Sequence, residues 1–143
     1  MALNWHWLPC VTRYALHLQP AGLQAHFVLA TVQESVYLYE MVLAPDAKVL
    51  QRVSGAVGSR ALEGAQALFE EAGVPYEREI GSGDPAQTLI EIAGRFGCEA
   101  IILGARGRGM PRNALLGSVS QAVPHAFKVP VTIVKHDAVG FAR

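Results

Sequence analysis

The chain has 143 residues, of which 51% are hydrophobic, and its 12 basic and 12 acidic side chains leave a formal net charge of zero. This length predicts one domain with a substantial core, and the balanced charge excludes a general electrostatic attraction to nucleic acid or acidic lipid. Cys10 and Cys98 lie too far apart for a metal or redox motif, and no apolar run reaches membrane-spanning length, so we expect a soluble cytoplasmic protein.

Strands and helices are predicted to alternate beyond residue 24. The short apolar stretch AHFVLATVQ indicates a strand over His26–Gln33. Residues 35–45 predict an irregular connection. Apolar spacing over residues 46–73 then indicates a helix, which Gly73 is expected to end. A short strand with the sequence VPYEREIG follows at residues 74–81.

The clearest helix signal lies at residues 83–97. Asp84 suits the N-cap position, Pro85 suits the first turn, and Gly97 is typical of a helix end. The spacing of apolar residues predicts one buried face on this helix. Its residues are Leu89, Ile92, Ala93 and Phe96.

The last third of the chain predicts strand, loop, helix and strand. The stretch CEAIILGA at residues 98–105 is nearly all apolar, as in a strand covered on both faces. A helix is expected from Ser118, and Pro124 predicts that it bends or ends near Val123. The stretch VPVTIVK at residues 129–135 predicts the closing strand. This alternation indicates an α/β fold with a parallel sheet and right-handed crossovers.

The loop GARGRGMPRNALLGSVS, residues 104–120, lies where such sheets bind ligands, directly after a strand. Its glycines let backbone N–H groups approach a ligand, and the first turn of the following helix favours an anion. Arg106 and Arg108 add charge-assisted donors. The alternative is an ordinary loop in which the glycines serve tight turns, Ser118 only caps the helix and the arginines are solvated.

Several kinds of catalytic site find no support in the sequence. The P-loop motif is absent, and the glycines of GARGRG do not have the order of a dinucleotide-binding motif. The five histidines share no metal-ligand spacing. No carboxylate pair or Ser–His–Asp set can be assigned to catalysis, so we do not expect an enzyme beyond slow hydrolysis of a nucleotide.

The glycine spacing of the loop resembles a known family motif. Gly104-x-x-Gly107, nine residues and then Gly117-Ser118 is similar to the G-2x-G-9x-G-[S/T] motif of the universal stress protein family. The resemblance implies a Rossmann-like α/β fold with a five-stranded parallel sheet, or four strands plus a remnant of the first, with helices on both faces. It also implies a single domain over residues 1–143 and a homodimer through the last strand, around Val131 to Val134.

The resemblance further implies a bound ATP or AMP, with Mg²⁺ as a companion ion, in a regulatory role. The loop would hold ribose and phosphates, while Val32 and Leu103 would line the adenine pocket. Together with Arg108, chosen for its charge, the expected nucleotide-binding residues are Val32, Leu103, Gly104, Gly107, Arg108, Gly117, Ser118, Val119 and Ser120.

Residues 1–21 depart from the family pattern, in which a first strand similar to ILVPVDGS supplies an aspartate near the adenine. Either LPCV, residues 8–11, is a remnant of that strand, with Val11 in the place of the aspartate and a short helix over residues 12–19, or the strand is missing. An alternative function is therefore a protein-interaction module that has lost nucleotide binding. A third alternative is an adenylate-forming enzyme of related architecture, although no glycine–serine phosphate loop follows the first strand.

Overall fold

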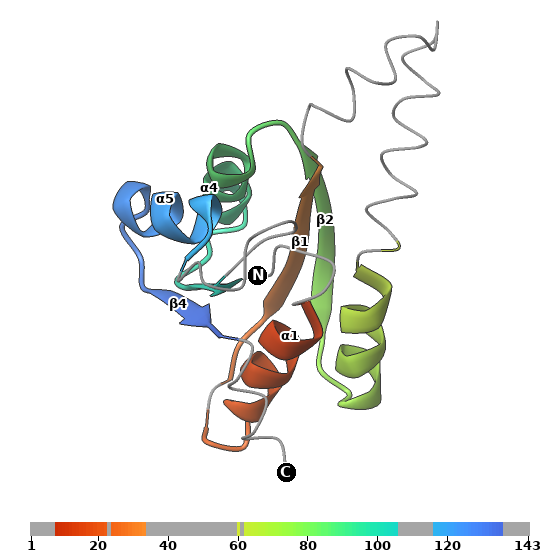
Figure 1. The fold of residues 1–143 in the computed structure, drawn as a ribbon. Helices are drawn as coiled ribbons and strands as arrows, with labels where there is room; N and C mark the ends of the chain where they lie inside the picture. The colour runs from red at the N-terminus through yellow and green to blue at the C-terminus, as the bar shows by residue number, and fades with distance from the viewer. Residues whose placement is uncertain (1–7, 23, 34–59, 61, 106–115, 136–143) are drawn as a thin grey trace, which may run out of the picture.

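A computed structural model describes residues 8–22, 24–33, 60, 62–105 and 116–135. The labelled elements are α1 (Leu8–His17), β1 (Phe27–Gln33), β2 (Tyr76–Ser82), α4 (Pro85–Arg95), β3 (Ile101–Gly104), α5 (Ser118–Ala126) and β4 (Val131–Val134). A further helix covers residues 62–71. Figure 1 shows α4 and α5 on one side of the strands and α1 with the 62–71 helix on the other. The predictions for residues 35–45 and for the first part of the 46–73 helix lie outside the described residues.

The described strands form two parallel pairs. β1 pairs with β2 along its whole length, from Phe27 opposite Tyr76, and β3 pairs with β4, ending with Gly104 opposite Val134. All seven residues of β1 are buried, whereas β2 is partly exposed. The predicted α/β class with parallel strands is therefore confirmed. The described residues contain four strands in two separate sheets, however, where one five-stranded sheet was expected.

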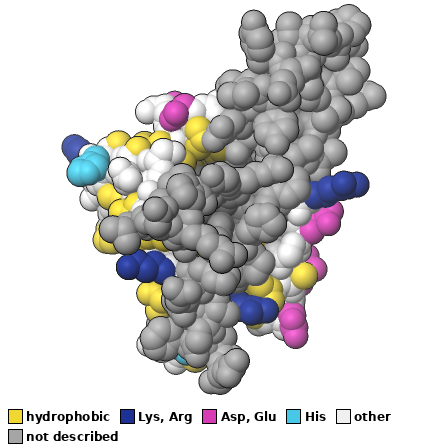
Figure 2. All heavy atoms as spheres, in the orientation of Figure 1, with side chains coloured by type: hydrophobic (Ala, Val, Ile, Leu, Met, Phe, Trp, Pro, Cys, Tyr) yellow, Lys and Arg dark blue, Asp and Glu magenta, His cyan; other side chains and the backbone are white. Residues whose placement is uncertain are grey.

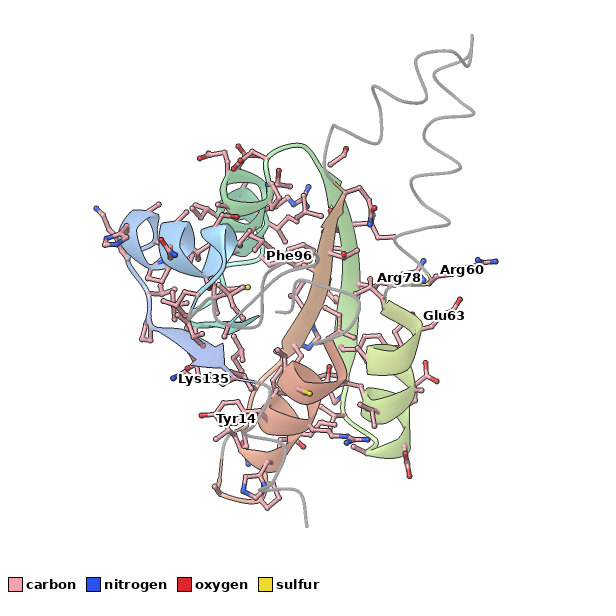
Figure 3. All side chains as sticks on the ribbon, viewed as in Figure 1. Tyr14, Arg60, Glu63, Arg78, Phe96 and Lys135 are labelled. Carbon is pink, nitrogen blue, oxygen red and sulfur yellow. The ribbon has the colours of Figure 1, made fainter. Side chains whose placement is uncertain are left out.

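Two apolar clusters connect the strand pairs. The first cluster lies beneath α1 and the 62–71 helix, with Tyr14 packed against it (Figure 3); its members are Val11, Ala15, Phe27, Leu29, Leu62, Ala65, Phe69, Val74, Ile102 and Val134. The second cluster lies beneath α4 and α5; its members are Val28, Ala30, Val32, Leu89, Ile92, Ala93, Ile101, Leu103 and Val123. β1 and β3 each contribute residues to both clusters, so both strand pairs lie between the same two clusters, although β1 and β3 do not pair with each other.

Helix α4 has the ends that its sequence predicts. The Asp84 carboxylate accepts a hydrogen bond from the Gln87 N–H at 2.9 Å, which satisfies one free donor of the first turn. Gly97 takes a positive φ of 62°, and the next N–H, from Cys98, donates to the Ala93 carbonyl at 2.8 Å. The predicted face is buried as far as Ala93, and Phe96 is half-buried at the C-cap. Similarly, Gly73 ends the 62–71 helix with a φ of 66°.

Helix α1 corrects the expectation for the N-terminal region. The LPCV stretch is helical, so of the two alternatives for this segment, the remnant strand followed by a helix from Thr12 is wrong. Pro9 is compatible with this helix because the first turn needs no N–H donor there. Val11 and Ala15, four residues apart, are 2% and 4% exposed and enter the first cluster. The helical spacing of the buried residues Val11 and Ala15 therefore accounts for the helix in this segment.

Helix α5 continues through Pro124 to Ala126, so it does not end near Val123. Pro124 lies inside the helix and is exposed. The N–H of Phe127 donates to the Val123 carbonyl at 2.9 Å, which maintains helical bonding beyond the proline. The proline therefore removes one helical donor without stopping the helix.

The described surface carries charges of both signs. In the view of Figure 2, Lys and Arg side chains lie at several separate places, and Asp and Glu side chains lie near the top and along the right of the molecule. This agrees with the formal net charge of zero. None of the helices in the described ranges has the length and apolarity that crossing a bilayer requires.

Candidate functional site

Three predicted site residues meet at the second cluster. Val32, near the end of β1, is 8% exposed and Leu103 of β3 is 1% exposed, and both belong to this cluster. Val119, in the first turn of α5, is half-buried and packs against the same cluster. The fold therefore brings the ends of two strands and the start of a helix together at one apolar cluster, and Val119 is the least buried of the three side chains.

The ends of the glycine-rich loop are tied together. Gly104 ends β3, and the N–H of the next residue, Ala105, donates to the Val134 carbonyl at 2.8 Å. The Ala105 carbonyl accepts the Gly117 N–H at 2.7 Å. The chain therefore returns at Gly117 to the carboxyl end of β3. Gly104 precedes Ala105 and Ser118 follows Gly117 in the chain. The hydrogen bond between Ala105 and Gly117 therefore brings two predicted phosphate-site residues near each other.

The first turn of α5 has the features of an anion site. Gly117 is the N-cap, in an extended conformation with φ −80° and ψ 170°, and no side chain caps the helix. The first N–H groups of any α-helix lack intrahelical acceptors, and the helix dipole makes this end positive. Ser118 is exposed, so its hydroxyl is accessible beside these N–H groups. A phosphate could accept hydrogen bonds from all of these donors.

Helix α4 provides a contrast within the same fold. It also begins just after a strand, but the Asp84 carboxylate occupies its N-terminus and accepts the Gln87 N–H. A negative side chain at that position satisfies the helix end and repels a second anion. Of these two helix N-termini, only that of α5 lacks a side-chain acceptor. The N-termini of α4 and α5 therefore differ in their capacity to bind phosphate.

Ser120 differs from the other predicted residues because its side chain is buried. The residue is 3% exposed, and its hydroxyl oxygen lies 2.7 Å from the Ala105 carbonyl oxygen and 3.0 Å from that of Gly117. Sequence reasoning assigned Ser120 to the ligand and missed the Ala105 carbonyl altogether. A pattern of side chains does not show which backbone carbonyl accepts a hydrogen bond, so the role of the Ala105 carbonyl could not be predicted from the sequence. Gly107 and Arg108, also predicted for this site, lie outside the described residues.

The two cysteines of the chain lie in its described part. Cys10 and Cys98 are free and half-buried, and burial raises the pKa of both thiols, which lowers the fraction of reactive thiolate. In the described part of the chain, no three His, Cys, Asp or Glu side chains are grouped as a metal site would require. The described chemistry of the site is therefore that of backbone N–H groups, one accessible hydroxyl and an apolar wall.

Comparison with known proteins identifies the family. The model of the universal stress protein family matches residues 11–135, which is most of the chain. The chain belongs to the universal stress protein family. Universal stress protein YxiE of Bacillus subtilis is 35% identical over 78 residues, which cover 54% of this chain and 53% of that protein. The match thus spans about half the length of the curated relatives.

Solved structures share the fold of this universal stress protein. The hypothetical protein MJ0577 superposes with a TM-score of 0.76 at 20% identity, covering 94% of this chain and 95% of that one. A universal stress protein family member from Arabidopsis thaliana, solved with AMP bound, has a TM-score of 0.62 at 21% identity, covering 90% of this chain and 79% of that one. At these identities the likeness shows the fold alone.

Proposed function

We propose that this universal stress protein binds an adenine nucleotide, ATP or AMP, in a regulatory role. The phosphates would lie at the first turn of α5, and the base would pack near Val32 and Leu103. The observation that carries this proposal is the uncapped N-terminus of α5, held at the carboxyl end of β3 by the Gly117–Ala105 hydrogen bond. The AMP bound by the Arabidopsis relative supports the choice of an adenine nucleotide.

The free donors at α5 favour a phosphate for two reasons. Anions at a helix N-terminus accept the unpaired N–H groups and interact favourably with the helix dipole. Gly117 also has no side chain to occupy the position at which a phosphate oxygen would approach. In this proposal Gly104 and Gly107 let the loop approach the ligand, Arg108 supplies positive charge, and Mg²⁺ accompanies ATP.

The test is calorimetric titration of AMP, and of ATP with Mg²⁺, into the parent protein and two variants. We expect micromolar binding by the parent. Ser118→Ala should weaken it about tenfold, because a hydrogen bond to a charged group is lost. A Gly117→Val, Ser118→Ala double variant should lose binding, because the new side chain also fills the phosphate position.

Ser82→Ala provides a matched control for this titration. Ser82 is exposed and lies at the end of β2, so the substitution removes the same hydroxyl group from a different strand end. Its affinity for AMP should equal that of the parent. Absence of binding by the folded parent, or equal losses in Ser82→Ala and Ser118→Ala, would contradict a phosphate site at α5.

We also propose that a fifth strand lies between β1 and β3, as the family's sheet implies. The support is that both strands contribute to the same two clusters and yet do not pair with each other. Successive N–H groups of a strand point to opposite edges, so an edge strand leaves alternate amides without ladder bonds. We expect slow hydrogen exchange at every amide from Val28 to Val32. Fast exchange at alternate residues would show that the second edge of β1 is open.

A second candidate function is a protein-interaction module that does not bind nucleotide. It is favoured by residues 8–17, which form helix α1 and so do not supply the first-strand aspartate of the family pattern. A homodimer through β4, in the cytoplasm, fits either function and remains a proposal. Molecular mass measured by light scattering with and without ATP separates the two functions. An oligomer that ignores ATP, in a protein without measurable binding, favours the interaction module.

A further inference from the structure

The buried hydroxyl of Ser120 connects two segments that flank the glycine-rich loop. Its oxygen lies 2.7 Å from the Ala105 carbonyl oxygen, fifteen residues away in the chain, and the side chain is buried. It lies 3.0 Å from the Gly117 carbonyl oxygen within its own helix turn. Both neighbours are acceptors, so Ser120 is the donor in each contact.

The single hydroxyl proton limits what else Ser120 can do. Phosphate oxygens at neutral pH act mainly as acceptors, so a serine must donate its proton to bind one. Two carbonyls already compete for this proton, and that of Ala105 is the nearer of the two. Donation to a phosphate would leave this contact without its proton, at the cost of a buried hydrogen bond.

The Ala105 carbonyl receives two donors from the start of α5. The Gly117 N–H donates to it at 2.7 Å, and the Ser120 hydroxyl donates at the same distance. A carbonyl oxygen has two lone pairs, so both are used. Two donors from one helix turn therefore hold that turn against the residue that follows β3.

We propose that Ser120 is a positioning residue for the phosphate site and that its side chain does not contact the nucleotide. Its hydroxyl holds the first turn of α5 on the Ala105 carbonyl, and so fixes where the free N–H groups of that turn and the Ser118 hydroxyl meet a phosphate. This role rests on the proposed function. In this proposal the two serines of one motif have different roles: exposed Ser118 contacts the ligand, and buried Ser120 orients the turn.

The experiment compares Ser120→Ala, Ser120→Thr and Ser118→Ala with the parent protein. Hydrogen exchange of the Gly117 amide is measured in the nucleotide-free protein, and AMP affinity is measured by calorimetry. Ser120→Ala should accelerate exchange of the Gly117 amide about tenfold, because the shared acceptor loses its second donor and the turn opens more often. It should also weaken AMP binding about tenfold.

The other variants separate positioning from direct contact. Ser120→Thr keeps the hydroxyl and should restore both readouts toward the parent values. Ser118→Ala should weaken AMP binding while leaving exchange at Gly117 unchanged. If Ser120→Ala weakens AMP binding without changing exchange at Gly117, Ser120 is a direct ligand and the inference is wrong. If the parent binds no AMP, the proposed function fails, whereas exchange at Gly117 still decides whether Ser120 holds the turn.

Discussion

Replacing Phe69 by alanine is expected to lower the free energy of unfolding by about 3–5 kcal/mol. Phe69 is 1% exposed and is among the largest fully buried side chains in the described part of the chain. Its ring lies 5.0 Å from that of Phe27 and 5.6 Å from that of Tyr76, between centroids. Truncation would remove both tilted aromatic contacts and leave a cavity beneath the 62–71 helix. Urea unfolding followed by circular dichroism measures the loss.

Phe96→Ala is the matched control for this substitution. Phe96 is half-buried at the C-cap of α4 and packs against the edge of the second cluster (Figure 3). The same chemical deletion there should cost less than half as much, because water already reaches part of the ring and no closed cavity forms. Equal losses for the two variants would mean that the 62–71 helix is not packed on the strands as described.

Replacing Gly81 by alanine is expected to destabilise the fold by about 1–3 kcal/mol. A β-carbon at Gly81 would lie 2.5 Å from Cγ2 of Thr88, closer than real β-carbons approach other atoms, and 3.2 Å from Cδ1 of Ile92, which is a tight contact. Both neighbours belong to α4, so these side chains must rotate or the helix must shift away from β2 to admit one methyl group. Gly81 pairs with Val32 in the sheet, so this movement would also disturb the apolar wall of the candidate site. Unfolding in urea and AMP titration measure the two effects.

Two further variants make this prediction specific. Gly94→Ala introduces the same methyl group into the exposed face of α4, where nothing lies within 4 Å of the new β-carbon. It should raise stability by about 1 kcal/mol, because alanine favours a helix over glycine. Thr88→Ser removes Cγ2 and should recover much of the loss when combined with Gly81→Ala. Destabilisation by both glycine substitutions, without recovery in the double variant, would rule out the close approach as the cause.

The sequence predicted the elements whose signals are local. Asp84 and Gly97 mark the two ends of α4, and their bonds connect residues no more than five positions apart. The apolar run AHFVLATVQ predicted the strand β1, and the structure shows that all seven of its residues are buried. Such patterns depend on the chain's own periodicity and capping, so a single sequence suffices to predict them.

Residues 8–17 show where pattern matching failed. The likeness of LPCV to the family's first strand suggested a remnant strand as one of two alternatives, whereas the spacing of Val11 and Ala15 indicates a helix face. The sheet also differs from the prediction: the described strands form two pairs, and β1 does not pair with β3. Pairing of strands depends on which backbone edges meet in space, and a residue pattern does not specify that.

The candidate site also has some features that the sequence predicted and others that only the structure shows. By itself the sequence determined the glycine spacing from Gly104 to Gly117, the helix that begins at Ser118 and the family to which these belong. Only the tertiary structure decided that Ser120 is buried, because its hydroxyl meets a carbonyl fifteen residues away. It likewise decided that Gly81 has no room for a methyl group. Hydrogen bonds and capping within one turn are encoded in neighbouring residues, whereas burial and close approach arise only when distant segments pack together.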